Sequence, residues 1–133
     1  MDVFTAMEVA SSGLSVQRAR LNVASANLAN ATTTKTAEGG PYQRREAIVR
    51  EEEIAGGGVA VKFMGVGLDP RPPRLEYDPG HPDANADGYV AYPNVNPVEE
   101  MVNMITASRA YEAGVTALGT AVSMAERALA IGK

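Results

Sequence analysis

The first thirty residues carry apolar side chains at a regular seven-residue spacing. The repeat consists of Met7, Leu14, Leu21 and Leu28, with Val3, Ala10, Gln17 and Ala24 between them. Such alternating three- and four-residue steps are typical of a coiled-coil seam. The pattern predicts a helix over about residues 3–30, which would be about 40 Å long at the α-helical rise. The alanines of the repeat favour a partner helix that packs closely.

A second stripe of mostly apolar residues runs through the last third of the chain. At three- and four-residue steps it comprises Met101, Ile105, Ser108, Tyr111, Val115, Leu118, Val122, Ala125 and Leu129. Asn96 and Pro97 are residue types favoured at the N-cap and at the first position of a helix, and Gly132 can end one. The sequence therefore predicts a second long helix, of about 50 Å, that begins at residue 97.

The residues between these stripes differ from both. All eight prolines and nine of the thirteen glycines lie in residues 32–97, and these residue types interrupt helices and form turns. Short strands are expected around residues 47–49 and over residues 59–66, 75–77 and 89–92, with a glycine turn at 56–58. The expected fold class is α+β, with two long terminal α-helices that pair as an antiparallel coiled coil and a small, β-rich and loop-rich central segment.

The composition leaves little bulky material for a self-contained core. Leu, Ile, Val and Phe together make 27 of the 133 residues, which is close to the fraction below which chains tend to be disordered. We therefore expect residues 1–32 and 97–133 to form an inner coiled-coil domain, residues 33–96 to form a central segment, and other chains to cover the exposed apolar faces. The alternative is an ordinary two-helix packing inside a monomeric domain.

Charge and composition exclude several classes of protein. The net charge of −4 argues against a nucleic-acid binder, which usually presents a basic face. The absence of cysteine excludes disulfides, thiolate zinc sites and cysteine nucleophiles. No apolar run approaches the roughly 20 residues that a membrane span needs, and the N-terminus lacks the basic start and apolar stretch of a cleaved secretory signal.

The segment from Asp83 to Gly88 matches the opening of an EF-hand calcium loop. Oxygen-bearing side chains and a glycine occupy the positions that such a loop requires at its start. The closing position should be a bidentate glutamate but is Asn94, and the proline-rich flanks cannot form the two flanking helices. Asx residues also form turns by bonding nearby backbone groups. A calcium- or peptide-binding adaptor that uses this loop is therefore the alternative function.

The remaining candidate residues form no recognisable catalytic set. His81, the sole histidine, lies between a glycine and a proline, and Asp78 and Asp83 are the nearby candidates for metal ligands. No nucleophile elbow of the Gly-x-Ser-x-Gly kind occurs, and the acidic run at residues 51–53 is typical of a solvated strand edge. We expect no enzymatic activity, no cofactor and no metal ion. A small hydrolase that uses His81 is a further and weaker hypothesis.

Three stretches of the sequence resemble one known family. The motif SANLAN at residues 25–30, followed by the threonine-rich ATTTKT, resembles a motif shared by bacterial flagellar rod and hook subunits. The stretch EGGPYQRRE at residues 38–46 and the long run from Tyr77 to Ala113 resemble the proximal rod subunits of that family. The resemblance covers essentially the whole chain, and the long run is its most specific part.

This resemblance implies a structural subunit of the flagellar proximal rod. In such a rod the terminal helices line a helical tube that crosses the periplasm, transmits torque and lets exported subunits pass. The subunit would be exported unfolded by the flagellar export apparatus, without a cleaved signal peptide. Its partners would be copies of itself, other proximal and distal rod subunits and the hook–basal body adaptor, with no nucleic acid and no membrane span.

Assembly should depend on the two apolar stripes and on the asparagines of the SANLAN motif. The expected interface residues are Val3, Met7, Leu14, Leu21, Asn27, Leu28, Asn30, Met101, Ile105, Tyr111, Val115, Leu118, Val122 and Leu129. Burial of these side chains between subunits would hold the tube together, because each buried apolar side chain contributes on the order of 1.5–3 kcal/mol.

Overall fold

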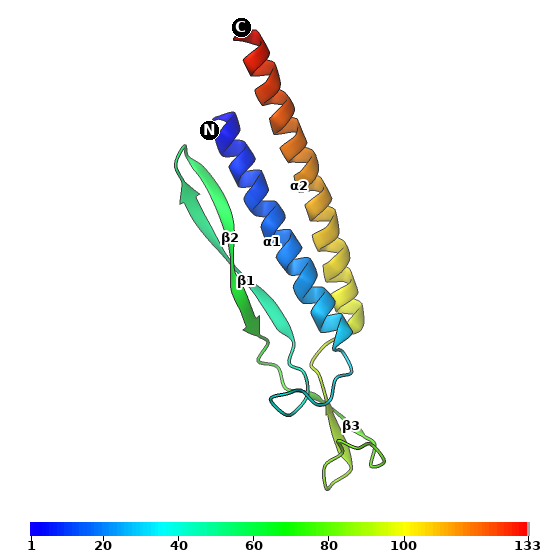
Figure 1. The fold of residues 1–133 in the computed structure, drawn as a ribbon. Coiled ribbons are helices and arrows are strands. Elements are labelled where there is room, and N and C mark those ends of the chain that lie inside the picture. The colour runs from blue at the N-terminus through cyan, green and yellow to red at the C-terminus, as the bar shows by residue number, and fades with distance from the viewer. Residues whose placement is uncertain (133) are drawn as a thin grey trace.

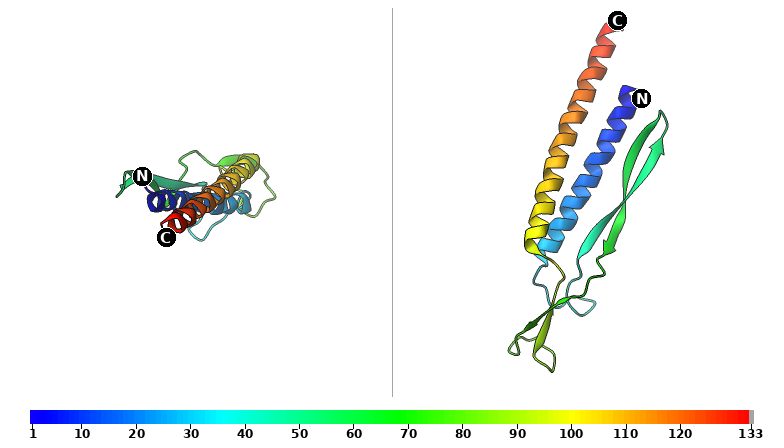
Figure 2. Two further views of the ribbon diagram at one scale, coloured as in Figure 1. Left: turned by 90° about the horizontal axis from the view of Figure 1, so that it is seen from above. Right: turned by 180° about the vertical axis from the view of Figure 1, so that it is seen from behind.

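The protein is an elongated pair of helices with two β-hairpins, as seen in a computed structural model that describes residues 1–132 (Figure 1). Its elements in chain order are α1 (Val3–Ala29), β1 (Arg45–Ile54), β2 (Gly58–Leu68), β3 (Arg74–Tyr77), β4 (Tyr89–Tyr92) and α2 (Pro97–Ile131). The helices are antiparallel, so both termini lie at one end, and the β3–β4 hairpin extends beyond the other end (Figures 1 and 2). The expected α+β class is confirmed.

Both helices begin where their capping residues predict. The carboxylate of Asp2 accepts a hydrogen bond of 2.8 Å from the backbone nitrogen of Thr5, which satisfies one of the free donors at the start of α1. The Asn96 side chain does the same for Val98 and Glu99 at the start of α2. Within residues 1–132, no helix is long and apolar enough to cross a membrane.

Small residues allow the two helices to pack closely. Ala24 on α1 and Ala107 on α2 are buried. A side-chain carbon at Gly114 would lie 2.7 Å from the Leu14 side chain, so this glycine lets α1 come close. Glu100 and Ala107 are the two buried residues of α2, and most of the other residues of this long helix are exposed.

The bulky residues of the second apolar stripe lie mostly outside this helix contact. The exposed fractions are 49% for Met101, 54% for Ile105, 49% for Val115 and 67% for Leu129. The sequence suggested that the two stripes pair with each other, but α2 turns a neighbouring face of small residues toward α1. Two helices alone can bury one face each, and the face with alanine and glycine permits the closest approach.

The β1–β2 hairpin lies along α1, on the side away from α2 (Figure 1). Its antiparallel register runs from the Arg45–Leu68 pair to the Ile54–Gly58 pair, with an irregularity at Ile48 and Val49. Gly58 packs against α1, where an added side-chain carbon would lie 2.9 Å from Thr5. The strands are longer than the sequence signals indicated, because pairing and the contact with α1 extend them through charged residues.

The β3–β4 hairpin forms a second, separate two-stranded sheet. Tyr77 and Tyr89 pack edge to face across it, with ring centroids 5.3 Å apart, and the guanidinium of Arg74 lies 5.4 Å from the ring centroid of Tyr92. Val90 of β4, which pairs with Glu76, is fully buried. These two strands lie where the sequence predicts them, at residues 74–77 and 89–92.

Candidate functional site

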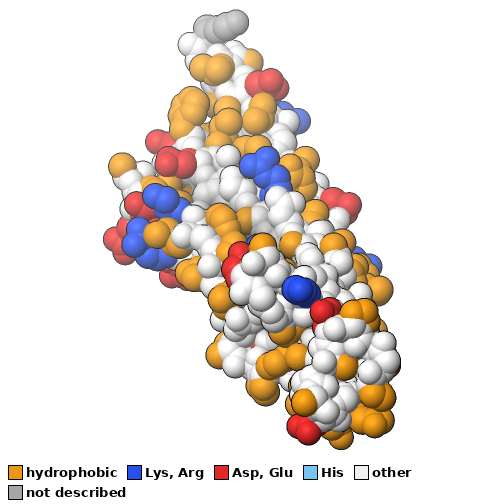
Figure 3. All heavy atoms as spheres, turned by 60° about the horizontal axis from the view of Figure 1, so that its bottom comes forward, with side chains coloured by type: hydrophobic (Ala, Val, Ile, Leu, Met, Phe, Trp, Pro, Cys, Tyr) orange, Lys and Arg blue, Asp and Glu red, His pale blue; other side chains and the backbone are white. Residues whose placement is uncertain are grey.

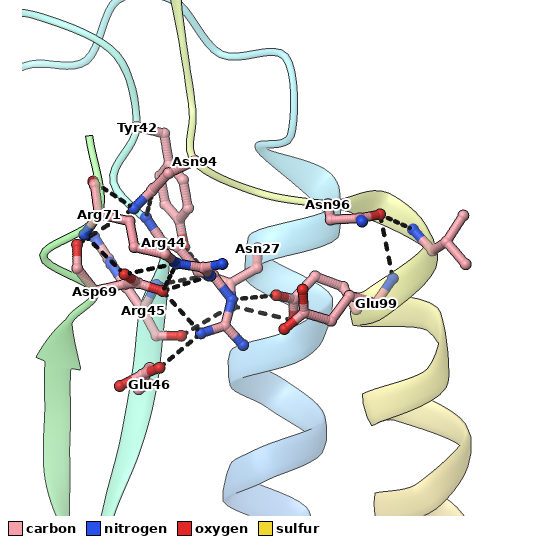
Figure 4. Close-up of polar contacts among 12 residues, drawn as sticks. Asn27, Tyr42, Arg44, Arg45, Glu46, Asp69, Arg71, Asn94, Asn96 and Glu99 are labelled. Atoms are coloured by element: carbon pink, nitrogen blue, oxygen red, sulfur yellow. Dashed lines mark hydrogen bonds and ion pairs between the residues drawn. The ribbon is translucent and has the colours of Figure 1, made fainter. Parts of the chain in front are cut away.

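A buried polar cluster joins the ends of four elements at the base of the helix pair (Figure 4). We call this cluster the junction, and its members are Asn27, Tyr42, Arg44, Asp69, Arg71, Asn94 and Glu100. It connects the end of α1, the start of β1, the end of β2 and the start of α2. Within residues 1–132, every buried side-chain nitrogen and oxygen has a hydrogen-bond partner, so the junction is fully satisfied.

Asn27, at the centre of the SANLAN motif, ties α1 to three other segments. Its side-chain nitrogen donates to the backbone oxygen of Arg45 (2.9 Å) and to Glu100 (3.3 Å). Its side-chain oxygen accepts from the Tyr42 hydroxyl (2.8 Å) and from the backbone nitrogen of Arg45 (2.9 Å). All the usual bonds of one asparagine side chain are therefore made inside the subunit, and Asn27 is only 1% exposed.

Arg44 forms the ionic centre of the junction. Its Nε donates to the carboxylate of Glu100, and its Nη1 donates to Glu46 (2.8 Å) and Asp69 (3.3 Å). Burial alone would lower the pKa of Arg44, but bonding to Glu100 and Glu46 outweighs that effect and raises it above its ordinary value. The arginine thus stays charged, and its charge is shared among carboxylates from three different segments.

Asp69 fixes the end of β2 against the segment that leads into α2. Arg71 donates to its carboxylate from Nε and Nη2 at 2.7–3.1 Å, and this contact holds the pKa of Asp69 well below its usual range. Asn94 accepts from the backbone nitrogen of Arg44 (2.8 Å) and donates to the backbone oxygen of Arg71 (2.9 Å). The junction therefore sets how both hairpins leave the helix pair.

We expect Asp69→Asn to change how acid affects the subunit. The pKa of Asp69 is lowered by folding, so its stabilising effect is fully present above the unfolded value of about 4 and is lost as pH falls through the folded value. The variant should be less stable at pH 7 but should lose less stability between pH 5 and pH 3 than the wild type. Urea unfolding followed by circular dichroism at several pH values gives the free energy of unfolding of each protein. Parallel dependence of this free energy on pH in the variant and the wild type would contradict the prediction.

The loop from Asp83 to Gly88 is a set of local turns. The side-chain oxygen of Asn85 accepts from the backbone nitrogens of Asp87 (3.0 Å) and Tyr89 (2.9 Å), and Asp83 accepts from the Thr34 hydroxyl (2.7 Å). Among residues 1–132, no group of three or more histidine or acidic side chains is arranged to hold a metal ion. One of the oxygens that the calcium hypothesis requires, that of Asn85, instead bonds the backbone of the loop.

We expect calcium to leave the protein unchanged, because the Asn85 oxygen already bonds two backbone nitrogens. Titration calorimetry with calcium chloride should give no binding heat, and Asp87→Ala should respond to a calcium chelator as the wild type does. Saturable heat with micromolar affinity would revive the adaptor hypothesis.

His81 also has a local structural role. Its Nδ1 accepts a hydrogen bond of 3.0 Å from the backbone nitrogen of Asp83, and its ring packs edge to face on Tyr92 with centroids 6.2 Å apart. The acidic run at residues 51–53 lies exposed on β1, whereas His81 lies in the loop between β3 and β4, a hairpin at the opposite end of the molecule from the β1–β2 turn (Figure 1). The structure therefore does not bring the candidate catalytic residues of the sequence together.

The expected interface residues fall into three groups. Asn27 is buried in the junction, and Asn30 caps α1 by donating from its side chain to the backbone oxygen of Ala26 (2.9 Å). The α1 members are half-buried, as is Leu118; they are Val3, Met7, Leu14, Leu21 and Leu28. The other α2 members are exposed; they are Met101, Ile105, Tyr111, Val115, Val122 and Leu129. An interface role for these residues stays a prediction.

Sequence reasoning missed most of the junction. Tyr42 and Arg44 lie in the stretch EGGPYQRRE at residues 38–46, whose residue types alone indicate no buried polar contact. Glu100 lies in the first turn of α2, where acidic residues favour the helix dipole from an exposed position, although its side chain is buried. A usable signal was its position: it lies seven residues before Ala107 and fourteen before Gly114, on the face that α2 turns toward α1.

Comparison with known proteins defines the class. A family described as "Flagella basal body rod protein" matches residues 7–35, and one described as "Flagellar basal body rod FlgEFG protein C-terminal" matches residues 86–131. These two matches cover most of α1 and of α2 and identify a flagellar basal-body rod protein.

Full-length relatives narrow the class to one family. The flagellar basal-body rod protein FlgC of Borreliella burgdorferi is 42% identical over 98% of both chains. The FlgC proteins of Bacillus subtilis and Salmonella typhimurium are each 39% identical over the whole of both chains. The chain belongs to the FlgC family.

Proposed function

We propose that this protein is a structural subunit of the proximal rod in the flagellar basal body. The observation that carries the proposal is similarity over the full length to proteins named as basal-body rod proteins. The shape of the molecule agrees with such a role. Its two helices form a long, stiff unit, and the apolar side chains of α2 lie exposed where neighbouring subunits could cover them.

The subunit would act through its packing contacts with other subunits and not through catalysis. In this proposal the helix pairs of successive copies line a helical tube, and their exposed stripes meet across subunit boundaries. The junction would transmit torque between the helices and the two hairpins, because charged hydrogen bonds from several segments resist bending at that point. The tube would leave a central channel through which other exported subunits pass.

The proposed partners are those that a rod position requires. They are copies of this chain, the other proximal and distal rod subunits, the hook–basal body adaptor and, during export, the flagellar export apparatus. The proposed location is the rod where it crosses the periplasm, reached without cleavage of a signal peptide. The thin core supports export in an unfolded form, since such a subunit gains much of its buried area only after assembly.

Deletion of the gene in the source bacterium tests the proposal. Cells without the protein should be non-motile, and electron microscopy of their basal bodies should show a motor ring without a rod beyond it. A plasmid copy should restore both the rod and swimming. Complete rods in the deletion strain would contradict the proposal.

A further inference from the structure

A groove of about 380 Å³ lies between α1, the start of β1 and α2. Buried Ala24, Asn27 and Ala107 are among the residues that line it, and Arg20 and Arg45 line it with exposed side chains. A space of this size accommodates several side chains of a second protein segment.

The groove carries positive charge that the subunit does not neutralise. Three arginines and two glutamates line it, and both glutamates are bonded to Arg44. Within residues 1–132, neither Arg20 nor Arg45 forms an ion pair. The guanidinium of Arg45 lies 5.4 Å from the ring centroid of Tyr42. The groove thus offers two arginines to an anionic group.

The same chain presents an anionic segment of matching charge. Residues 51–53 are three consecutive glutamates near the turn of the β1–β2 hairpin, and all three are exposed. Within the described residues none of them forms an ion pair. Figure 3 shows charged side chains of both signs gathered at the left, the side on which Figure 1 places this hairpin. The position of the glutamates at a solvated strand edge would explain why they are exposed. It does not explain why Arg20 and Arg45 in the groove are unpaired.

The glutamates cannot reach the groove of their own subunit. Gly56, in the turn that follows them, packs against Thr5. Thr5 and Arg20 are fifteen residues apart on α1, which corresponds to about 22 Å along the helix. Arginine and glutamate side chains together are too short to span that separation, so any contact must join two copies.

We propose that the groove receives the acidic end of the β1–β2 hairpin from a neighbouring copy of this chain. This inference rests on the proposed function and adds a specific contact to it. A parallel neighbour displaced by roughly 20 Å along α1 would bring its glutamates to Arg20 and Arg45. Guanidinium–carboxylate bonds in a partly enclosed groove are stronger than at an open surface, and they would fix the axial offset between copies.

Cross-linking tests the contact without removing the charges that make it. The chain has no cysteine, so a variant with Gln17→Cys in the groove and Ala55→Cys in the hairpin turn has just two thiols. A short bis-maleimide reagent applied to purified basal bodies should then produce dimers and higher multiples of this chain. Each single variant should give none, and neither should the control pair Ser15→Cys and Ala55→Cys, because Ser15 is exposed on α1 outside the groove.

A charge exchange gives a second, independent readout. Arg20→Glu and Glu53→Arg should each reduce the diameter of swimming halos by about twofold or more, and the two changes combined should restore much of the loss, since opposite charges again face each other. Arg18→Glu is the matched control, because Arg18 is exposed on the same helix but does not line the groove.

The results of the cross-linking experiment distinguish a failure of the proposed contact from a failure of the proposed function. Absence of cross-links in basal bodies that contain normal amounts of the chain would overturn the contact and leave the proposed function intact. Cross-links from the groove cysteine to a different protein would also overturn it, because another rod subunit would then occupy the groove. Absence of the chain from basal bodies would overturn both proposals.

Discussion

Replacing Glu100 with alanine is expected to destabilise the subunit by about 3 kcal/mol, because it removes two buried hydrogen bonds to a charged group, each of which contributes about 1.5–3 kcal/mol. Glu100 is 1% exposed and accepts hydrogen bonds from Arg44 and Asn27. Without it, Arg44 keeps its other carboxylates but loses the one that connects it to α2. A subunit with so thin a core has little stability in reserve, so swimming should be lost as well. Urea unfolding of the purified protein and swimming assays measure the two effects.

Glu99 provides the matched control for this change. It is the preceding residue, also lies in the first turn of α2, and is exposed. Glu99→Ala should cost at most about 1 kcal/mol through the helix dipole. Glu100→Gln should be intermediate, because its amide nitrogen would meet the donating nitrogen of Asn27. Equal stability of the Glu99 and Glu100 alanine variants would refute the assignment of the junction as the structural centre of the subunit.

The second large effect is expected from Val115→Asp, which should impair assembly of the rod and not folding of the subunit. Val115→Asp places a charge on the exposed stripe of α2, at a side chain that is 49% exposed in the subunit. Because the site is open to water in the isolated chain, the free energy of unfolding measured with urea should change by less than about 0.5 kcal/mol. If neighbouring copies cover the stripe, the buried charge should prevent incorporation into the rod. Swimming and the amount of the protein in basal bodies should both fall to the level of a deletion strain.

Thr120→Asp is the control for the stripe. Thr120 is exposed on the same helix, and its hydroxyl donates to the backbone oxygen of Thr116 on a polar face that the stripe does not include. An aspartate there should leave both folding and assembly nearly unchanged. Normal swimming with Val115→Asp, or an equal loss with Thr120→Asp, would show that the apolar stripe is not the assembly surface.

The helices could be predicted from the sequence because their signals are local. A capping asparagine, a proline at the first helical position and a repeat of three- and four-residue steps depend on neighbouring residues alone. The rotation of α2 about its axis could not be predicted in that way. It depends on which face packs against α1, and the bulky stripe was the more obvious candidate. The structure favours the face with Ala107 and Gly114, which leaves Ile105 and Val115 available to other chains.

The junction was beyond sequence reasoning for a different reason. Asn27 and Glu100 are 73 residues apart, and Arg44 and Asp69 are separated by a hairpin. Each of these side chains alone is typical of a solvated surface position, and their charges become informative only once the fold brings them together. The SANLAN motif pointed to Asn27 through resemblance, but its role in joining α1 to β1 and α2 follows from the contacts.

Mass spectrometry of purified basal bodies shows directly whether this chain is a structural part of the rod. Basal bodies should be isolated from wild-type cells and from cells that carry Val115→Asp or Thr120→Asp. We expect this chain to be present together with other rod proteins in the wild type and in the Thr120 variant, and to be absent with Val115→Asp. Complete basal bodies that lack this chain in wild-type cells would contradict a structural role in the rod.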